Sequence, residues 1–119
     1  MIKGFSLDIC GCEVSFAWDT NDKELSAFLD KYELAEDAKQ GFFSVLNYVS
    51  KASAVTIQIA DTGNVIVVFF GEPNNKDVAH ELYHVACRIM EGRGISEEES
   101  WAYLIGYLTE MFYSLYLEE

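Results

Sequence analysis

Two parts of the chain carry patterns that predict β-strands: one alternates between apolar and polar residues, and the other is apolar and β-branched. Between residues 4 and 18, most apolar residues occur at every second position on either side of Gly11, which indicates a turn or bulge between two short strands. Residues 54–60 and 65–70 are apolar and β-branched, and a turn sequence containing Gly63 joins them, which predicts a β-hairpin. Residues 71–75 combine glycine, proline and asparagine and end the second strand of this hairpin.

Apolar residues three or four positions apart predict helices in the rest of the chain. Residues 22–50 carry two such stripes and form one helix or two, with a break expected at Gly41 or within residues 33–37. One helix is expected over roughly residues 76–91, because Gly92 and Gly94 stop it, and another over roughly residues 97–117. This order of elements places the chain in the α+β class, and since no linker or repeat divides it, we expect a single domain over residues 1–119.

The composition changes this picture mainly through charge. Half of the 119 residues are apolar and 14% are aromatic, which is enough for one hydrophobic core. The 20 acidic residues outnumber the 8 basic ones and give a net charge of −12. Such a surface repels phosphate backbones and anionic lipids, so we expect no nucleic acid and no membrane as partner. Cationic partners and metal ions suit it better.

The sequence also predicts a cytoplasmic protein. Ser6 and Asp8 interrupt the apolar residues at the start of the chain, so no secretory signal is expected. Polar side chains interrupt the most apolar stretch, residues 101–117, which is therefore expected to be a buried helix. The three cysteines are an odd number and are expected to be reduced thiols with structural roles. They are Cys10, Cys12 and Cys87.

One short sequence predicts chemistry: residues 80–84 form an HExxH motif on the helix expected over roughly residues 76–91. Its two histidines, His80 and His84, are the only ones in the chain. Residues four apart lie on one helical face, about 6 Å from each other, so both imidazoles can reach one Zn²⁺ ion. Glu81 lies about 100° around the helix, beside the metal, where it could act as general base on zinc-bound water.

The apolar residues of the same helix lie on the side opposite the two histidines. His80 and His84 are therefore not expected in the core of this face. Either a second element covers them, or they are an ordinary surface pair without a metal. The apolar residues are Val78, Ala79, Leu82, Val85, Ala86, Ile89 and Met90.

A catalytic zinc site needs a third protein ligand, and the last helix offers Glu99. The residues on the same helical face as Glu99 are Tyr103, Gly106 and Glu110. Glycine at position 106 would permit a close crossing with the HExxH helix. The alternative is that Glu99 forms a capping box with Ser96 and serves the start of the last helix.

His80-Glu81-x-x-His84, a short loop, and Glu99 at the head of a Glu-x-x-Ala-Tyr sequence resemble the minimal gluzincin-type zinc metallopeptidases. This group includes ImmA/IrrE-like proteins and small HExxH proteins encoded by phages and prophages. The resemblance covers residues 77–110. It implies a small zincin-like fold, in which a short β-sheet with a hairpin packs on the HExxH helix and a C-terminal helix. It also implies a phage-related, zinc-dependent metallopeptidase that acts on a peptide or protein substrate.

The resemblance assigns roles to single residues. His80, His84 and Glu99 would bind zinc, and Glu81 would be the base. Because no further histidine is left to stabilise the oxyanion, Tyr103 would do so through its phenol, unless it packs between helices. Residues 65–70 would be an edge strand that holds extended substrate through backbone hydrogen bonds. The substrate-binding positions on this strand are Val65, Val67 and Phe69.

A second hypothesis is a non-catalytic protein of phage or mobile-element origin, in which the metal site is structural or vestigial. A chain of 119 residues has little material for a substrate cleft. Its acidic surface and aromatic last helix would then serve partner binding, including a homodimer through the C-terminal helix. A hydroxamate separates the two hypotheses, because it binds a catalytic metal with an open position and not a closed structural site.

Overall fold

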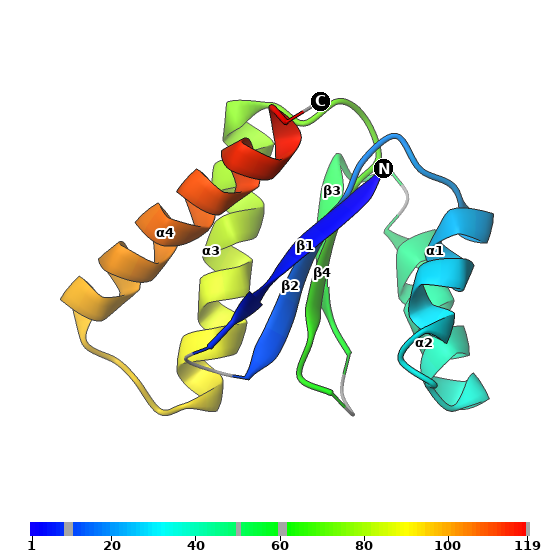
Figure 1. The fold of residues 1–119 in the computed structure, drawn as a ribbon, viewed down its shortest axis with the longest axis horizontal. Coiled ribbons are helices and arrows are strands. Elements are labelled where there is room, and N and C mark those ends of the chain that lie inside the picture. Colours follow the sequence, from blue (N-terminus) through cyan, green and yellow to red (C-terminus); the bar gives the residue numbers. More distant parts are fainter. Residues whose placement is uncertain (9–10, 50, 60–61, 119) are drawn as a thin grey trace.

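A mixed β-sheet separates two layers of helices in the computed structural model of the chain (Figure 1). The structure describes residues 1–8, 11–49, 51–59 and 62–118. Within these residues the four strands are β1 (Ile2–Leu7), β2 (Cys12–Ala17), β3 (Ala54–Gln58) and β4 (Val65–Phe69). The four helices of the same residues are α1 (Asp22–Asp30), α2 (Glu36–Tyr48), α3 (Asn75–Gly92) and α4 (Glu98–Tyr116). The expected α+β class is confirmed.

The strands lie in the order β1-β2-β4-β3. Both local pairs are antiparallel, as the alternation and the hairpin sequence predicted. Gly11 follows β1 with a φ of +62°, a left-handed conformation that glycine adopts without strain. The two pairs join through β2 and β4, which run parallel, with Val14 opposite Val65. Ile9 and Cys10 lie outside the described residues.

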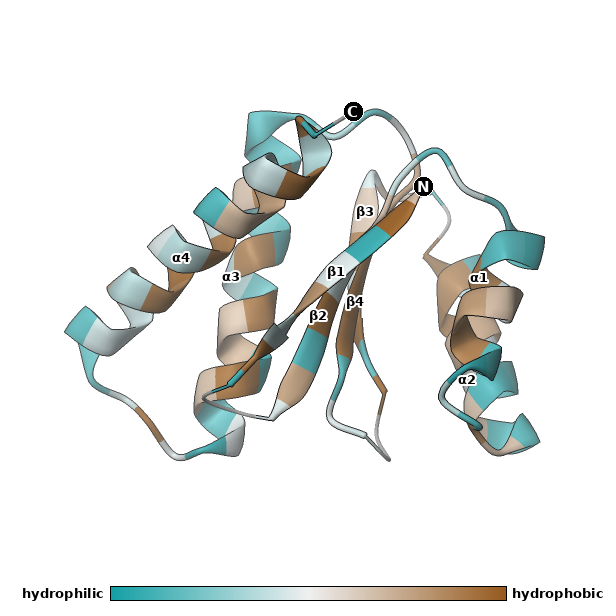
Figure 2. Ribbon diagram, viewed as in Figure 1, coloured by the Kyte–Doolittle hydropathy of each residue, from teal (hydrophilic) through white to brown (hydrophobic). Residues whose placement is uncertain are grey.

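Both faces of the sheet are covered, so β4 is buried throughout and β2 is buried except at the half-buried Glu13. One face packs against α3 and α4, and Figure 2 shows apolar residues of these helices turned toward it. The largest strand side chains buried on this face are those of Phe16 and Phe69. The other face packs against α1 and α2, with Ile66 and Val68 contacting Leu25. Burial on both faces explains why β4 is continuously apolar rather than alternating.

The expectation that residues 65–70 form an edge strand is wrong. β4 lies between β2 and β3, and both of its edges are paired within the sheet. Val65, Val67 and Phe69 are at most 4% exposed and belong to the core against α3 and α4. They cannot hold a substrate strand, because no backbone edge is free there. The edge strand on the side of α3 is β3.

The helical stretch of residues 22–50 divides where the sequence indicated. α1 ends at Asp30 and α2 begins at Glu36, so the break overlaps the expected residues 33–37, and Gly41 lies inside α2. The Asn21 side chain caps α1 by accepting a hydrogen bond from the backbone N–H of Glu24. The apolar face predicted for α3 is confirmed, except that Ala79 is exposed.

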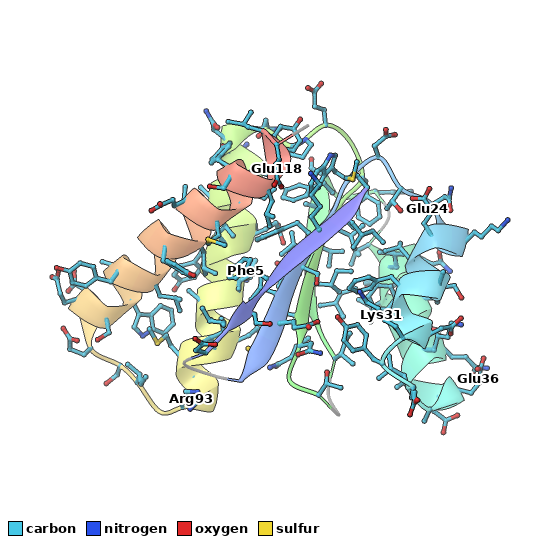
Figure 3. All side chains as sticks on the ribbon, viewed as in Figure 1. Phe5, Glu24, Lys31, Glu36, Arg93 and Glu118 are labelled. Atoms are coloured by element: carbon cyan, nitrogen blue, oxygen red, sulfur yellow. The ribbon has the colours of Figure 1, made fainter. Side chains whose placement is uncertain are left out.

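α4 closes the core over β1 and β2 through one fully buried ring. Phe112 lies with its centroid 5.0 Å from that of Phe16 and 5.5 Å from that of Phe69. Phe5 of β1 contacts Tyr107 of α4, and Figure 3 shows Phe5 between its strand and the helices. The Glu118 carboxylate lies 3.6 Å from the Lys3 ammonium group of β1. The Cα radius of gyration of 13.8 Å is close to the roughly 13 Å of a compact domain of this length.

Of the two cysteines that the structure describes, Cys12 differs from the expectation. Cys12 is disulfide-bonded, so a reduced thiol at this position is wrong. Cys10 lies outside the described residues. Cys87 is a free, half-buried thiol, as expected. None of the helices in the described part of the chain has the length and apolar character needed to cross a bilayer.

Candidate metal centre

Helix α3 presents the two histidines of the HExxH motif to solvent. Its first turn is capped by Asn74, whose side chain accepts a hydrogen bond from the backbone N–H of Asp77. The apolar stripe of the helix turns toward the sheet, and His80 and His84 lie on the exposed side, as predicted. The His80 side chain is 67% exposed. A ligand can therefore reach the pair from solvent.

The two imidazoles converge on each other. The Nε2 atoms of His80 and His84 are 3.2 Å apart, and the ring centroids are 4.8 Å apart. Two nitrogen ligands about 2.0–2.1 Å from a tetrahedral zinc ion are roughly 3.3 Å from each other. The ring nitrogens thus fit a pair of ligands to one metal ion. Without a metal, the same separation allows one ring to donate a hydrogen bond to the other.

Glu81 is the buried member of the motif. It is 5% exposed, and its Oε2 lies 3.8 Å from His80 Nε2. Its Oε1 accepts a 2.9 Å hydrogen bond from the Thr56 hydroxyl on the edge strand β3. One carboxylate oxygen is therefore held by the sheet, and the other faces the histidines.

Thr56 is a residue of this site that the sequence analysis missed. Its hydroxyl also lies 3.3 Å from the backbone carbonyl oxygen of Glu81. The available signal was a polar residue between Val55 and Ile57, in the strand Ala54–Gln58. A polar residue at this position indicates a polar neighbour on the element that packs against the strand, but it does not indicate which residue that is.

The structure does not bring Glu99, the expected third zinc ligand, to the histidines. Within residues 1–8, 11–49, 51–59 and 62–118, no three His, Cys, Asp or Glu side chains form a group that could hold a metal ion. Glu99 is exposed, on the side of α4 opposite the buried Leu104 and Leu108. His80 and His84 therefore fit the expected ion, and Glu99 does not.

The capping box expected as the alternative is also not formed. Glu97, not Ser96, caps α4, and its carboxylate accepts hydrogen bonds from the backbone N–H groups of Glu99 and Ser100. An acidic residue at this place also interacts favourably with the helix dipole. Glu99 thus serves α4 as a backbone donor, and its side chain stays free of the cap.

Tyr103 and Gly106 share the outward face of Glu99. Tyr103 is 74% exposed, so it does not pack between helices. A Cβ atom at Gly106 would meet nothing within 4 Å, so no close crossing requires glycine there. The crossing at Gly106 depended on this face turning inward, and the face turns to solvent.

A different tyrosine lies beside the histidines. The Tyr83 ring is 6.3 Å from the His84 ring and 6.0 Å from the Trp101 ring of α4. A hydrogen bond with the Cys87 thiol raises the pKa of Tyr83 above its ordinary value. This phenol beside the candidate metal centre therefore ionises less readily than an ordinary tyrosine.

No protein-family model, curated protein or solved structure matches this chain. The resemblance to gluzincins therefore rests on the residues of the two C-terminal helices alone.

As the pH falls into the acidic range, the Glu97→Gln variant is expected to lose less stability than wild type. The Ser100 hydroxyl, followed by the backbone N–H groups of Glu99 and Ser100, holds the pKa of Glu97 below its ordinary value. The stabilisation is present above the ordinary glutamate pKa of about 4.3 and is lost as the pH falls through the lowered value. The Tm difference between wild type and E97Q should therefore shrink from about pH 7 to about pH 3. E98Q is the control. A Tm difference between wild type and E97Q that does not change with pH would contradict the capping role of the Glu97 carboxylate.

Proposed function

We propose that this protein is a metal-dependent hydrolase of peptide bonds, with its metal centre on the exposed face of α3. One observation supports the proposal most strongly. Two histidine Nε2 atoms lie 3.2 Å apart, beside a buried carboxylate that the edge strand holds in place. Two imidazoles on one helical face and an adjacent glutamate are the groups with which an HExxH helix binds zinc and activates water.

In this proposal His80 and His84 hold the ion. A bound zinc ion would supply a Lewis acid that polarises water and a carbonyl group. Glu81 accepts a proton through Oε2, the oxygen that faces His80. It then returns this proton to the leaving amine. Thr56 keeps Oε1 occupied, so the carboxylate presents a single free oxygen in a fixed direction.

Peptide bonds are proposed as the substrate because of the sequence resemblance and the position of the edge strand. β3 has one unpaired backbone edge among the described strands, and it contacts α3. An extended peptide could add to that edge through backbone hydrogen bonds. This assigns to β3 the role that the resemblance implied for residues 65–70. A zincin-like relationship of the fold is part of the same proposal.

A hydroxamate tests the catalytic form of this proposal without a known substrate. Protein loaded with zinc or Co²⁺ should bind acetohydroxamate, since two histidines leave coordination positions open. Cleavage of a quenched peptide library should disappear on chelation and return with zinc. Metal binding without hydroxamate binding would favour the non-catalytic hypothesis instead.

Thr56→Val is expected to retain the metal and to lower kcat by up to about 100-fold. The substitution removes the hydroxyl that orients Glu81, and misplacement of a reacting group by about 1 Å has an effect of this size. Thr56→Ser restores a hydroxyl and should recover most of the activity. Equal activity in T56V and wild type would contradict the positioning role of Thr56.

A further inference from the structure

The chain leaves the carboxyl ends of its two parallel strands in opposite directions. After β2 it runs to α1 on one face of the sheet, and after β4 it runs to α3 on the other face (Figure 1). In open α/β sheets such a divergence leaves a crevice outside the strand ends, and ligands bind in that crevice. Neither histidine of the metal centre borders this end of the sheet.

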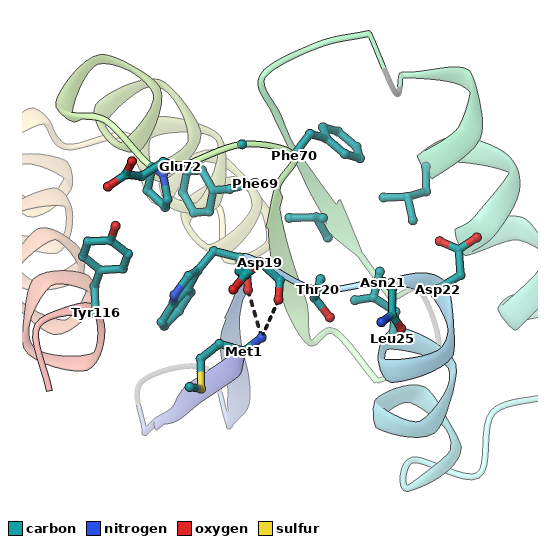
Figure 4. Close-up of a pocket in the computed structure, with 15 residues that line it drawn as sticks. Met1, Asp19, Thr20, Asn21, Asp22, Leu25, Phe69, Phe70, Glu72 and Tyr116 are labelled. Carbon is teal, nitrogen blue, oxygen red and sulfur yellow. Dashed lines mark hydrogen bonds between the residues drawn. The ribbon is translucent and has the colours of Figure 1, made fainter. Parts of the chain in front are cut away.

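A cavity of about 660 Å³ occupies this position, within the size range of small-molecule sites. We call it the strand-end cavity. Its aromatic side includes the buried Trp18 and Phe69, the half-buried Tyr116, and Phe70, which is 38% exposed. Figure 4 shows Phe69 and Tyr116 on one side of the cavity and Leu25 on the other. The cavity therefore offers apolar area to the body of a ligand.

Three carboxylates border the same cavity: those of Asp19, Asp22 and Glu72. No hydrogen bond or ion pair joins their side chains to another residue that the structure describes. No lysine or arginine is among the residues that line the cavity. At its edge, the α-ammonium group of Met1 donates to the carbonyl oxygens of Trp18 and Asp19, at 2.9 and 3.2 Å (Figure 4).

This chemistry distinguishes between classes of ligand. The N-terminus of α1 would ordinarily attract anions, but Asp22 and Glu24 already occupy its first turn. The three carboxylates do not gather into one group of the kind that holds a single metal ion, among the residues that the structure describes. An organic cation fits both the separated carboxylates and the aromatic wall, since ammonium and guanidinium groups also bind aromatic faces. The net charge of −12 favours its approach.

We propose that the strand-end cavity binds an organic cation, an amine or guanidine on an aliphatic chain, whose charge lies among Asp19, Asp22 and Glu72. The cation is either a free small molecule or a basic side chain of another protein. This site does not depend on the metal centre, and a chain without bound metal should bind the cation equally well.

Backbone NMR of the full chain with EDTA present tests the proposal. The probes are agmatine, 1-pentanol as an uncharged molecule of similar length, and the peptide acetyl-Gly-Arg-Gly-amide. Agmatine should shift the amide signals of Trp18, Thr20 and Gly71 in a saturable way, and pentanol should not. Binding of agmatine alone assigns a free amine, and tighter binding of the peptide assigns a protein side chain.

Asp19→Asn and Glu72→Gln should each weaken agmatine binding about two- to fivefold, the effect expected for one exposed charge pair. Asparagine tolerates the left-handed backbone of Asp19, whose φ is +49°, so this variant should keep the fold. Glu110→Gln, on the exposed face of α4, is the matched control and should change nothing. Absence of saturable shifts, equal binding of pentanol, or equal weakening in E110Q would overturn the proposal.

Discussion

Glu81→Gln is expected to lower peptide hydrolysis by about 10²- to 10⁴-fold while the protein keeps its metal. Glutamine preserves the size of the side chain, and its carbonyl oxygen can still accept the hydrogen bond from Thr56. What it lacks is an oxygen that can take up a proton beside His80. The comparison is kcat for wild type and E81Q at equal metal content.

The same variant separates a catalytic role from a structural one. Glu81 is buried, so a charge at this position bears a desolvation cost that neutral glutamine avoids. E81Q should therefore be at least as stable as wild type in a thermal unfolding experiment. Full activity in E81Q would contradict the assignment of Glu81 as the proton acceptor. A marked drop in the Tm of E81Q would show that the Glu81 carboxylate has a structural role.

Phe112→Ala is expected to have the largest effect on stability, a loss of about 3–5 kcal/mol in the free energy of unfolding. Phe112 is fully buried and contacts rings from β2, β4 and α4. Alanine leaves a cavity at the point where α4 meets the sheet. Domains of this size have a total stability of about 5–15 kcal/mol, so the change removes a large share of it.

Urea unfolding measures this effect, with Tyr103→Ala as the matched control. Tyr103 is an aromatic residue of the same helix but is 74% exposed, so its removal should change stability by no more than about 0.5 kcal/mol. Phe112→Leu keeps most of the apolar volume and provides a folded variant if F112A does not fold. A loss below about 1 kcal/mol in F112A would contradict the packing described for α4.

Local patterns predicted most elements of the fold, because each depends on neighbours in sequence. The hairpin of β3 and β4, the break between α1 and α2, and the apolar face of α3 were all predicted in this way. The parallel pairing of β2 with β4 was not predicted. It joins segments about 50 residues apart, and no local residue pattern specifies which strand becomes the partner.

The misplaced edge strand shows how a resemblance can override a better local signal. Residues 65–69 read Val-Ile-Val-Val-Phe, a continuous apolar run typical of a strand buried on both faces. The resemblance instead implied that Val65, Val67 and Phe69 border a substrate cleft. The structure agrees with the composition of the strand.

The candidate site divides in a similar way. The spacing of His80 and His84 was sufficient to predict their convergence, because both residues lie on one helix. The position of Glu99 depended on how α4 turns about its own axis. Helical periodicity places Glu99 and Tyr103 on one face, but the apolar face with Leu104 and Phe112 decides the rotation. Burying that face directs Glu99 to solvent.

Metal content tests the central claim that His80 and His84 hold a metal ion on α3. Wild type, His84→Ala and Glu99→Ala would be purified without a metal-affinity tag, reconstituted with zinc and analysed side by side by mass spectrometry. The proposal, which rests on the convergence of the two imidazoles, predicts about one zinc per chain in wild type and E99A, and none in H84A. Loss of zinc in E99A would show that Glu99 is a ligand and that α4 turns differently from the structure described here. Absence of zinc in reconstituted wild type would contradict the metal centre itself.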